Sequence, residues 1–163
     1  MTKMPEVAPA GQRPDQKQKP QVFSLKTPLV SEGTVNNVVV DSDNLWVWVK
    51  VYASGGENFI HAHMAEDHSF IVMDGEATFH FPEGKDTVVG KYGGILIPRG
   101  AYYSFTSTGS GPLVLLRVGG GAARYHDSRV WWPGEVDDRA ERQRTVENGE
   151  FFGDPEAEKL AAQ

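Results

Sequence analysis

Three of the five histidines lie close together in the sequence, at positions 61, 63 and 68, and their spacing suits a metal centre. His61 and His63 are two residues apart, so on a β-strand their side chains project from the same face. His68 follows a short turn, Met64–Asp67, and opens the next antiparallel strand beside them. Neutral imidazole nitrogens are good ligands for Fe, Mn, Ni, Cu and Zn. The three histidines therefore predict a site for a divalent transition metal, with a metal-free cluster of hydrogen-bonded histidines as the alternative.

Other polar residues near this cluster are expected to be less important. Glu66 and Asp67 flank the turn, and we expect both to be solvated; either supplies a carboxylate ligand only if His68 points away. His80 is expected to face outward, because its aromatic neighbours on the same strand fill the core. His126 follows the β-rich region and is expected at the surface.

The segment that must position the histidines has a β-strand pattern. From Val22 to Val118 the sequence alternates, is rich in β-branched and aromatic residues, and is interrupted by Gly, Pro, Asn or Asp at short intervals. The strands are expected at Asn37–Val40, Leu45–Ala53, Phe59–Met64, His68–Met73, Ala77–Phe81, Thr87–Val89, Gly94–Pro98, Tyr102–Ser107 and Leu113–Val118. This pattern is typical of an antiparallel, all-β sandwich or barrel.

One predicted strand, Leu45–Ala53, is apolar on both faces. The face with Val47, Val49 and Val51 and the opposite face with Trp46 and Trp48 both need to be covered. One face is expected to line the barrel, and the other to pack on a second sheet or on a second subunit. This pattern favours a homodimer.

The two ends of the chain differ in composition from the middle. Residues 1–21 are rich in Pro, Lys and Gln and predict a flexible arm, with a strand-exchange arm that reaches a neighbouring subunit as the alternative. Residues 22–133 form the predicted barrel domain, and residues 134–163 form an acidic, partly irregular tail with nine acids and four bases. Gly119–Gly121 is expected to be a hinge and Asp137–Arg144 a short helix. Four aromatic residues are expected to cover one mouth of the barrel or to dock onto a partner: Trp131, Trp132, Phe151 and Phe152.

The spacing of the histidines, glycines and a downstream Pro-x-Gly-x-x-Tyr resembles the two sequence motifs of the cupin superfamily. Residues that fall on the spacings of these motifs are Gly55, His61, His63, position 68, Gly75, Pro98, Gly100 and Tyr103. The resemblance covers residues 35–118 and implies a double-stranded β-helix, or jelly-roll, barrel with a metal at its centre.

The departures from the cupin motifs affect the expected ligands. His68 stands where the family usually has Glu, and Tyr103 stands where the second motif usually has His. The second motif also has Tyr92 at its first Gly and Ser107 at its final Asn. The resemblance implies ligation by His61, His63 and His68, with Tyr103 as a fourth ligand or as a hydrogen-bond donor to bound oxygen or substrate. Such a neutral ligand set keeps the full dipositive charge on the metal and favours an anionic substrate.

The resemblance implies a metal-dependent enzyme, and we favour a non-haem oxygenase, with iron as the metal, that acts on a small metal-chelating organic molecule. Tyr103 and Glu57 are the expected catalytic residues, and Phe59, Phe105 and Arg99 are expected to form the substrate pocket. One alternative is a redox-free lyase or isomerase in which Glu57 or Tyr103 moves a proton. Another is a binding domain without catalysis, because the fold alone does not determine the function.

Composition argues against other classes of function. The net charge of −6 and pI of 5.3 disfavour binding to nucleic acid, and no helix-turn-helix pattern is visible. The sequence shows no apolar stretch that fits a membrane helix and no secretory leader. The absence of cysteine excludes disulfides and thiolate ligands within this sequence and agrees with a cytoplasmic protein.

Overall fold

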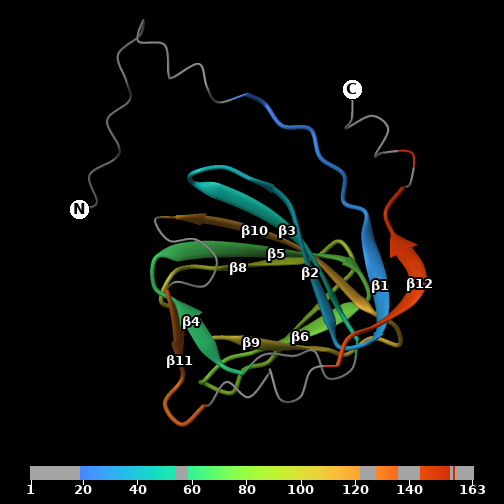
Figure 1. Cartoon of the computed structure of the whole chain (residues 1–163). Helices are drawn as coiled ribbons and strands as arrows, with labels where there is room; N and C mark the ends of the chain where they lie inside the picture. Colours follow the sequence, from blue (N-terminus) through green and yellow to red (C-terminus); the bar gives the residue numbers. More distant parts are fainter. Residues whose placement is uncertain (1–18, 54–58, 122–127, 136–143, 155, 157–163) are drawn as a thin grey trace, which may run out of the picture.

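The structure, a computed structural model, describes residues 19–53, 59–121, 128–135, 144–154 and 156. These residues form β-strands and connecting turns, with no helix among them (Figure 1). The strands are β1 (Thr27–Glu32), β2 (Thr34–Asp41), β3 (Leu45–Tyr52), β4 (His61–His63), β5 (Glu66–Asp74), β6 (Glu76–His80), β7 (Thr87–Gly90), β8 (Gly94–Ile97), β9 (Ser104–Ser107), β10 (Leu113–Gly121), β11 (Arg129–Trp131) and β12 (Val146–Phe152).

Two antiparallel sheets face each other to form the barrel. One has five strands in the order β2-β3-β10-β5-β8, and the other has three in the order β7-β6-β9. A two-stranded ribbon of β4 and β11 lies at one end, and a bridge between His61 and Tyr103 joins β4 to the segment before β9. Figure 1 shows the two layers one above the other, with β4 and β11 closing one side. The all-β, jelly-roll architecture is as predicted.

The core lies between the two sheets and is rich in aromatic side chains. Phe70 of the five-stranded sheet packs against Phe79 and Phe105 of the three-stranded sheet, with ring centroids 5.8 and 5.7 Å apart. These three phenylalanines are at most 1% exposed. Burial of side chains of this size is the main favourable contribution to folding.

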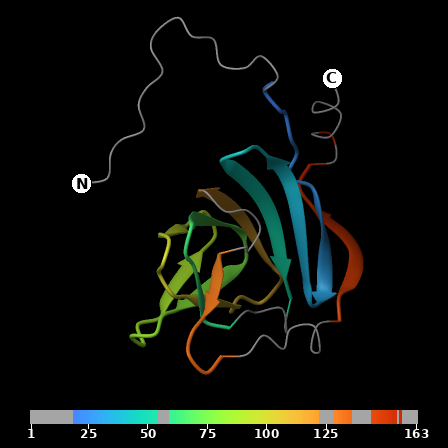
Figure 2. The same ribbon diagram turned by 60° about the vertical axis from the view of Figure 1, so that its left-hand side comes forward.

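The outer face of the five-stranded sheet is partly covered by strands from the two ends of the chain. Strands β1 and β12 pair antiparallel with each other and lie against β2 and β3, as Figure 2 shows. Val30 of β1 is buried among Val49, Val51 and Val114, and Phe152 of β12 packs on the same cluster. The outer face of β3 therefore packs on a second sheet of the same chain, which was one of the two alternatives. Strand β12 belongs to the predicted acidic tail, residues 134–163.

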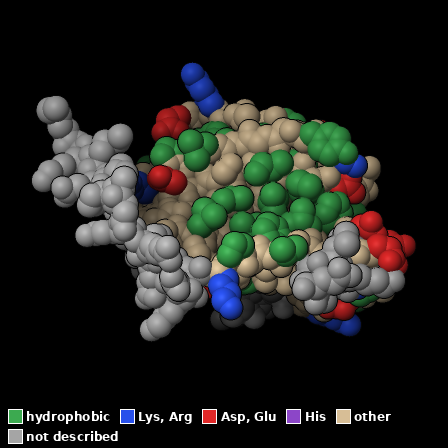
Figure 3. All heavy atoms as spheres, turned by 90° about the horizontal axis from the view of Figure 1, so that it is seen from above, with side chains coloured by type: hydrophobic (Ala, Val, Ile, Leu, Met, Phe, Trp, Pro, Cys, Tyr) green, Lys and Arg blue, Asp and Glu red, His purple; other side chains and the backbone are tan. Residues whose placement is uncertain are grey.

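The rest of this outer face is mainly apolar, and part of it is exposed. The strand register places Val47, Val118, Ser69 and Leu96 in one row across β3, β10, β5 and β8. Leu96 is 66% exposed. Figure 3, which views this side of the molecule, shows hydrophobic side chains gathered at the centre and charged side chains at the edge.

The nine predicted strands are all present, with ends that differ by a few residues. Strands β1, β11 and β12 were not expected from the sequence. The predicted hinge at Gly119–Gly121 is wrong, because these residues are the last three of β10 and pair with both β3 and β5. The predicted helix Asp137–Arg144 lies outside the described residues, except for Arg144. Among the described residues, no helix is long and apolar enough to cross a membrane.

Candidate metal centre

Two neighbouring strands supply the polar cluster. Strand β4 carries His61 and His63, which are 2% and 3% exposed. Strand β5 begins at Glu66, so the turn before it is shorter than expected. Glu66 and His68 alternate with the exposed Asp67 and point into the barrel together.

Glu66 corrects the prediction that both turn acids are solvated. Only Asp67 is exposed, whereas the Glu66 side chain is fully buried. The signal was present in the sequence: Glu66 extends the two-residue period of His68, Phe70 and Val72 by one step. The prediction missed Glu66 because it assigned residues 64–67 to a turn.

Glu66 lies between two histidines. Its Oε1 atom is 2.5 Å from His63 Nδ1 and 3.1 Å from His68 Nε2. One ligand atom each from His63, Glu66 and His68 lies within 4.8 Å of the others, a grouping that suits a metal ion. This group contains two of the three predicted histidines and adds Glu66, which was expected to be solvated.

His61 stands beside this group rather than within it. Its ring is 5.1 Å from that of His63 and 4.8 Å from that of Tyr103, measured between centroids. The Nδ1–H of His61 donates to the Phe59 carbonyl at 2.7 Å, which leaves the lone pair on Nε2. Metal-binding histidines are commonly oriented by such a hydrogen bond, so His61 remains suited to be an additional ligand.

Arg117 was not expected at the site. It lies on β10 at an interior position, two residues after the buried Leu115, and is 2% exposed. Its Nη2 atom donates to His68 Nε2 at 2.6 Å and lies 3.7 Å from Glu66 Oε1. Its guanidinium carbon is 5.2 Å from the Trp48 ring centroid. The alternation of β10 would place this side chain inside, but which interior residues it meets depends on strand pairing.

Burial keeps the histidines neutral. It lowers the pKa of His61 to about 2 and that of His68 to about 4, and it lowers the pKa of His63 as well. For Glu66, burial raises the pKa, but the imidazoles of His63 and His68 beside it outweigh burial and hold the pKa well below its usual range. At neutral pH the cluster therefore offers imidazole lone pairs and an ionised carboxylate.

Tyr103 lies deeper in the barrel, next to His61. It is 2% exposed, and burial raises the pKa of its phenol to about 12. The phenol therefore keeps its proton at neutral pH and can donate a hydrogen bond.

The other predicted site residues are spread more widely. Phe105 packs in the core against Phe70, and it is Phe70 whose ring contacts His68, with centroids 6.0 Å apart. Arg99 is exposed, and its backbone N–H donates to Asp67 Oδ1 at 2.8 Å. Glu57 lies outside the described residues.

Two histidines were expected to lie away from the site. His80 is half-buried and bonds to Thr106 and Asp86, while its neighbour Phe79 is fully buried, as expected. His126 lies outside the described residues.

The two tryptophans after the barrel cover its histidine end. Trp131 pairs with His61 across β11 and β4, and their rings are 5.4 Å apart. Trp132 packs edge-on against Tyr102 at 4.9 Å. Of the two alternatives for these residues, the structure shows a cover over one mouth of the barrel.

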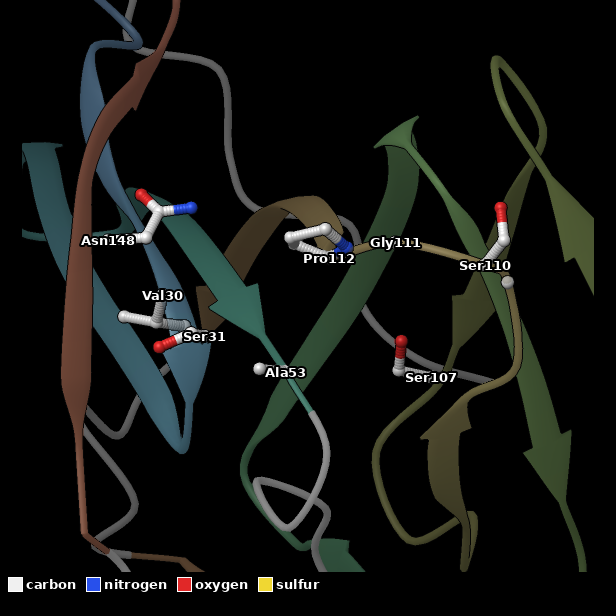
Figure 4. Close-up of a pocket in the computed structure, with 9 residues that line it drawn as sticks. Val30, Ser31, Ala53, Ser107, Ser110, Gly111, Pro112 and Asn148 are labelled. Atoms are coloured by element: carbon white, nitrogen blue, oxygen red, sulfur yellow. The ribbon is translucent and has the colours of Figure 1, made fainter.

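A cavity of about 450 Å³ lies at the other end of β10. Figure 4 shows it between β1 and β12 on one side and the turn at Ser110–Pro112 on the other. Gly119, six residues beyond Leu113 on β10, is the partner of His68, so the cavity is separated from the cluster by roughly 20 Å at 3.4 Å per residue. None of the cluster residues lines this cavity.

The donor atoms of the cluster fit a cation. Glu66 Oε2 is buried and has no hydrogen-bond partner among the described residues. Glu66 Oε1 lies 3.1 Å from His68 Nε2, and the carboxylate is ionised and buried. A buried carboxylate is unfavourable unless positive charge or hydrogen-bond donors lie against it, and a bound cation would supply that charge. Two imidazoles and one carboxylate are also the ligand set typical of non-haem Fe(II).

Comparison with known proteins supports the fold. No protein-family model matches the sequence, and no curated protein matches it either. Among solved structures, a Klebsiella pneumoniae protein with a double-stranded β-helix domain is 19% identical, with a TM-score of 0.54 over 61% of this chain and 79% of that one. KdgF from Halomonas sp. is 13% identical, with a TM-score of 0.52 over 56% and 82% of the chains. The cupin domain of Schizosaccharomyces pombe Cnp3 is 18% identical, with a TM-score of 0.51 over 54% and 64%.

These similar structures agree with the two facing sheets of the chain. The chain has the double-stranded β-helix fold of the cupin superfamily.

Proposed function

We propose that the chain is a metal-dependent cupin that holds a divalent transition metal through His63, Glu66 and His68. The observation that carries this proposal is the grouping of their ligand atoms within 4.8 Å, on two adjacent strands. We further propose a non-haem oxygenase that acts on a small organic molecule able to chelate the metal. Iron is the favoured metal because two histidines and a carboxylate suit Fe(II); Mn, Ni, Cu and Zn accept the same donors.

The charge of the site supports an anionic substrate. Glu66 adds one negative charge to the ligand set, which is less than the charge of a divalent metal. A dication bound here leaves the site with a net positive charge, which attracts a carboxylate or an enolate. An anionic substrate was also expected for the three-histidine site, so the expectation is the same for this set of ligands.

When bound, the metal supplies a Lewis-acidic and redox-active centre at which a substrate and dioxygen can meet. The residues of the chain have separate tasks. Tyr103 holds a proton that it can donate to an oxygen atom beside it. Trp131 and Phe70 pack against the histidine rings and exclude water. The Phe59 carbonyl orients His61.

A lyase or isomerase that needs no dioxygen is the second candidate. The observation that favours it is the buried, protonated phenol of Tyr103 next to His61. This group is a general acid whatever the redox state of the site. Glu57 remains a predicted partner base in this scheme.

Metal content and metal affinity test the proposal. The purified wild type and the variants Glu66→Gln and His68→Ala are compared by elemental analysis and by calorimetric titration with Fe²⁺, Mn²⁺ and Zn²⁺. Asp67→Asn is the matched control, because this neighbouring carboxylate is exposed. We expect about one metal per chain in the wild type and the control, and at least about tenfold weaker binding in the other two.

Turnover then separates the two candidates. The iron-loaded wild type is screened with small carboxylic and enolisable substrates while oxygen consumption is recorded. Turnover that consumes dioxygen supports the oxygenase, and anaerobic turnover with Zn²⁺ supports the lyase or isomerase. Wild-type protein that binds no metal after loading contradicts both.

A further inference from the structure

We propose that Arg117 is the resident cation of the metal-free site and that its guanidinium must leave His68 before a metal binds. Arg117 would thereby set the metal affinity of the cluster. This inference rests on the proposed metal site and concerns the regulation of its occupancy.

The geometry places the guanidinium where a metal would coordinate His68. Arg117 Nη2 lies 2.6 Å from His68 Nε2 and 3.3 Å from His68 Nδ1, so neither ring nitrogen is clear of it. A neutral imidazole has one lone pair. That lone pair either accepts a hydrogen bond from Arg117 or coordinates a metal ion. The two interactions are mutually exclusive at Nε2.

The metal-free cluster needs this cation. The Glu66 carboxylate is buried, and a buried charge without a partner is strongly unfavourable. Arg117 Nη2 is 3.7 Å from Glu66 Oε1 and 2.6 Å from His68 Nε2, so the guanidinium lies against both groups. In the metal-free site, Arg117 therefore supplies the positive charge that a metal ion would otherwise supply.

Arg117 is held by few directional bonds, so it can be displaced. Its Nε atom is buried and has no hydrogen-bond partner among the described residues. The guanidinium also lies against the Trp48 ring, 5.2 Å from the centroid. This cation–π contact does not depend on His68.

Repulsion adds to the competition for the lone pair. A dication at the cluster would lie close to the guanidinium in a water-poor interior, where like charges repel strongly. Metal binding therefore has to displace Arg117 or be weakened by it. Removal of this charge is expected to tighten metal binding.

The test is a calorimetric titration of the metal-free protein with Mn²⁺ and with Zn²⁺. Arg117→Met keeps the apolar stem and removes the charge, and it is expected to bind metal about 10- to 100-fold more tightly than the wild type. Arg117→Lys keeps a positive charge but lacks the planar guanidinium group, and it is expected to give an intermediate affinity.

Lys50→Met is the matched control. Lys50 is the other buried cation among the described residues, and its Nζ lies over the Tyr52 ring at 5.4 Å. We expect this variant to change the affinity less than about threefold, because no contact with His68 is removed. An increase equal to that of Arg117→Met would show a general field effect and overturn the inference.

The remaining outcomes separate this inference from the proposed function. Wild-type binding with no gain in Arg117→Met overturns the inference and leaves the metal site intact. No binding by the wild type or by any variant overturns the metal site itself. Binding by Arg117→Met alone supports the inference in its strongest form.

A second measurement uses the wild type and does not depend on the folding of a variant. The Arg117 side-chain N–H signals and the His68 ring nitrogens are followed by ¹⁵N NMR during a Zn²⁺ titration. We expect Arg117 signals that are protected from exchange in the metal-free protein to lose this protection at one equivalent of Zn²⁺. Unchanged protection with His68 fully metallated would overturn the inference.

Discussion

The Glu66 carboxylate stays ionised inside the barrel because three partners surround it. His63 and His68 contact its Oε1 atom, and Arg117 lies slightly farther away. The same burial that holds the histidines neutral leaves their lone pairs available. The cluster thus combines a fixed negative charge with neutral donors, which is what a divalent cation requires.

From the buried histidines we predict that the metal-free protein is destabilised by mild acid. The unfolded chain protonates its histidines near pH 6.5, whereas the folded-state pKa is about 4 for His68 and about 2 for His61. Between these values the unfolded state binds more protons, so the free energy of unfolding falls as the pH falls. Each such histidine contributes about 1.4 kcal/mol per pH unit.

Urea unfolding of the metal-free protein at pH 7, 6 and 5 measures this slope. A free energy of unfolding that does not change between pH 7 and pH 5 would contradict the neutral, buried histidines.

A second prediction concerns Tyr103. Because its phenol keeps its proton, we expect Tyr103→Phe to preserve metal affinity within about threefold and to lower turnover by about 10²-fold or more. Titration with Mn²⁺ and steady-state kinetics on the same preparation measure the two effects. A loss of metal affinity comparable to that of Glu66→Gln would instead identify the phenol as a ligand.

The strands determine which side chains can approach the cluster. Strand β10 lies between β3 and β5 and so brings Arg117 beside His68 and Trp48 beside Arg117. Gly119, farther along β10, faces the indole of Trp46, which leaves no room for a side chain at this position. The glycines at the end of β10 thus serve the packing of the barrel rather than the mobility of a hinge.

We therefore predict that Gly119→Ala destabilises the protein. A Cβ atom at Gly119 would collide with the Trp46 indole, and overpacking of this kind costs about 1–3 kcal/mol. Gly90→Ala is the matched control, because no atom lies within 4 Å of the added methyl group. Thermal or urea unfolding of both variants provides the measurement, and equal stability of the two would contradict the packing argument.

On the scale of the whole molecule, we predict that a second copy of the chain binds the part of the five-stranded sheet's outer face that β1 and β12 leave uncovered. The row of Val47, Val118, Ser69 and Leu96 carries no charge, so a two-fold axis through it opposes no like charges. Charged side chains of both signs surround the patch, as Figure 3 shows. Acidic side chains at the edge of one copy could therefore pair with basic side chains at the edge of the other. The homodimer thus remains a prediction, now based on this part of the sheet.

Leu96→Lys tests the dimer. A lysine at this 66% exposed position would place two cations in a two-fold interface, and we expect the dimer to dissociate at micromolar concentration. Val88→Lys is the control, since Val88 is 61% exposed on β7 of the other sheet and should not affect association. Analytical ultracentrifugation reports the mass; a monomeric wild type would contradict the dimer.

Local periodicity was enough to identify much of this protein. The two-residue period of His61 and His63, the nine strands and the spacing from Gly55 to Tyr103 are properties of neighbouring residues, so the sequence alone predicted a β-barrel, its cupin fold and the location of a polar cluster. The composition of that cluster depended on the length of one turn. The turn between β4 and β5 has two residues instead of the four predicted, so β5 begins at Glu66 and this side chain lies on the interior face of the strand.

The remaining features depend on contacts between residues far apart in the chain. Arg117 meets His68 only because β10 pairs with β5, and β1 meets β12 across almost the whole sequence. Strand pairing of this kind is selected by burial of complementary faces and has no short-range sequence signal. The tertiary structure alone therefore decided that a guanidinium lies beside the polar cluster and that β1 and β12 cover part of the outer face of the sheet.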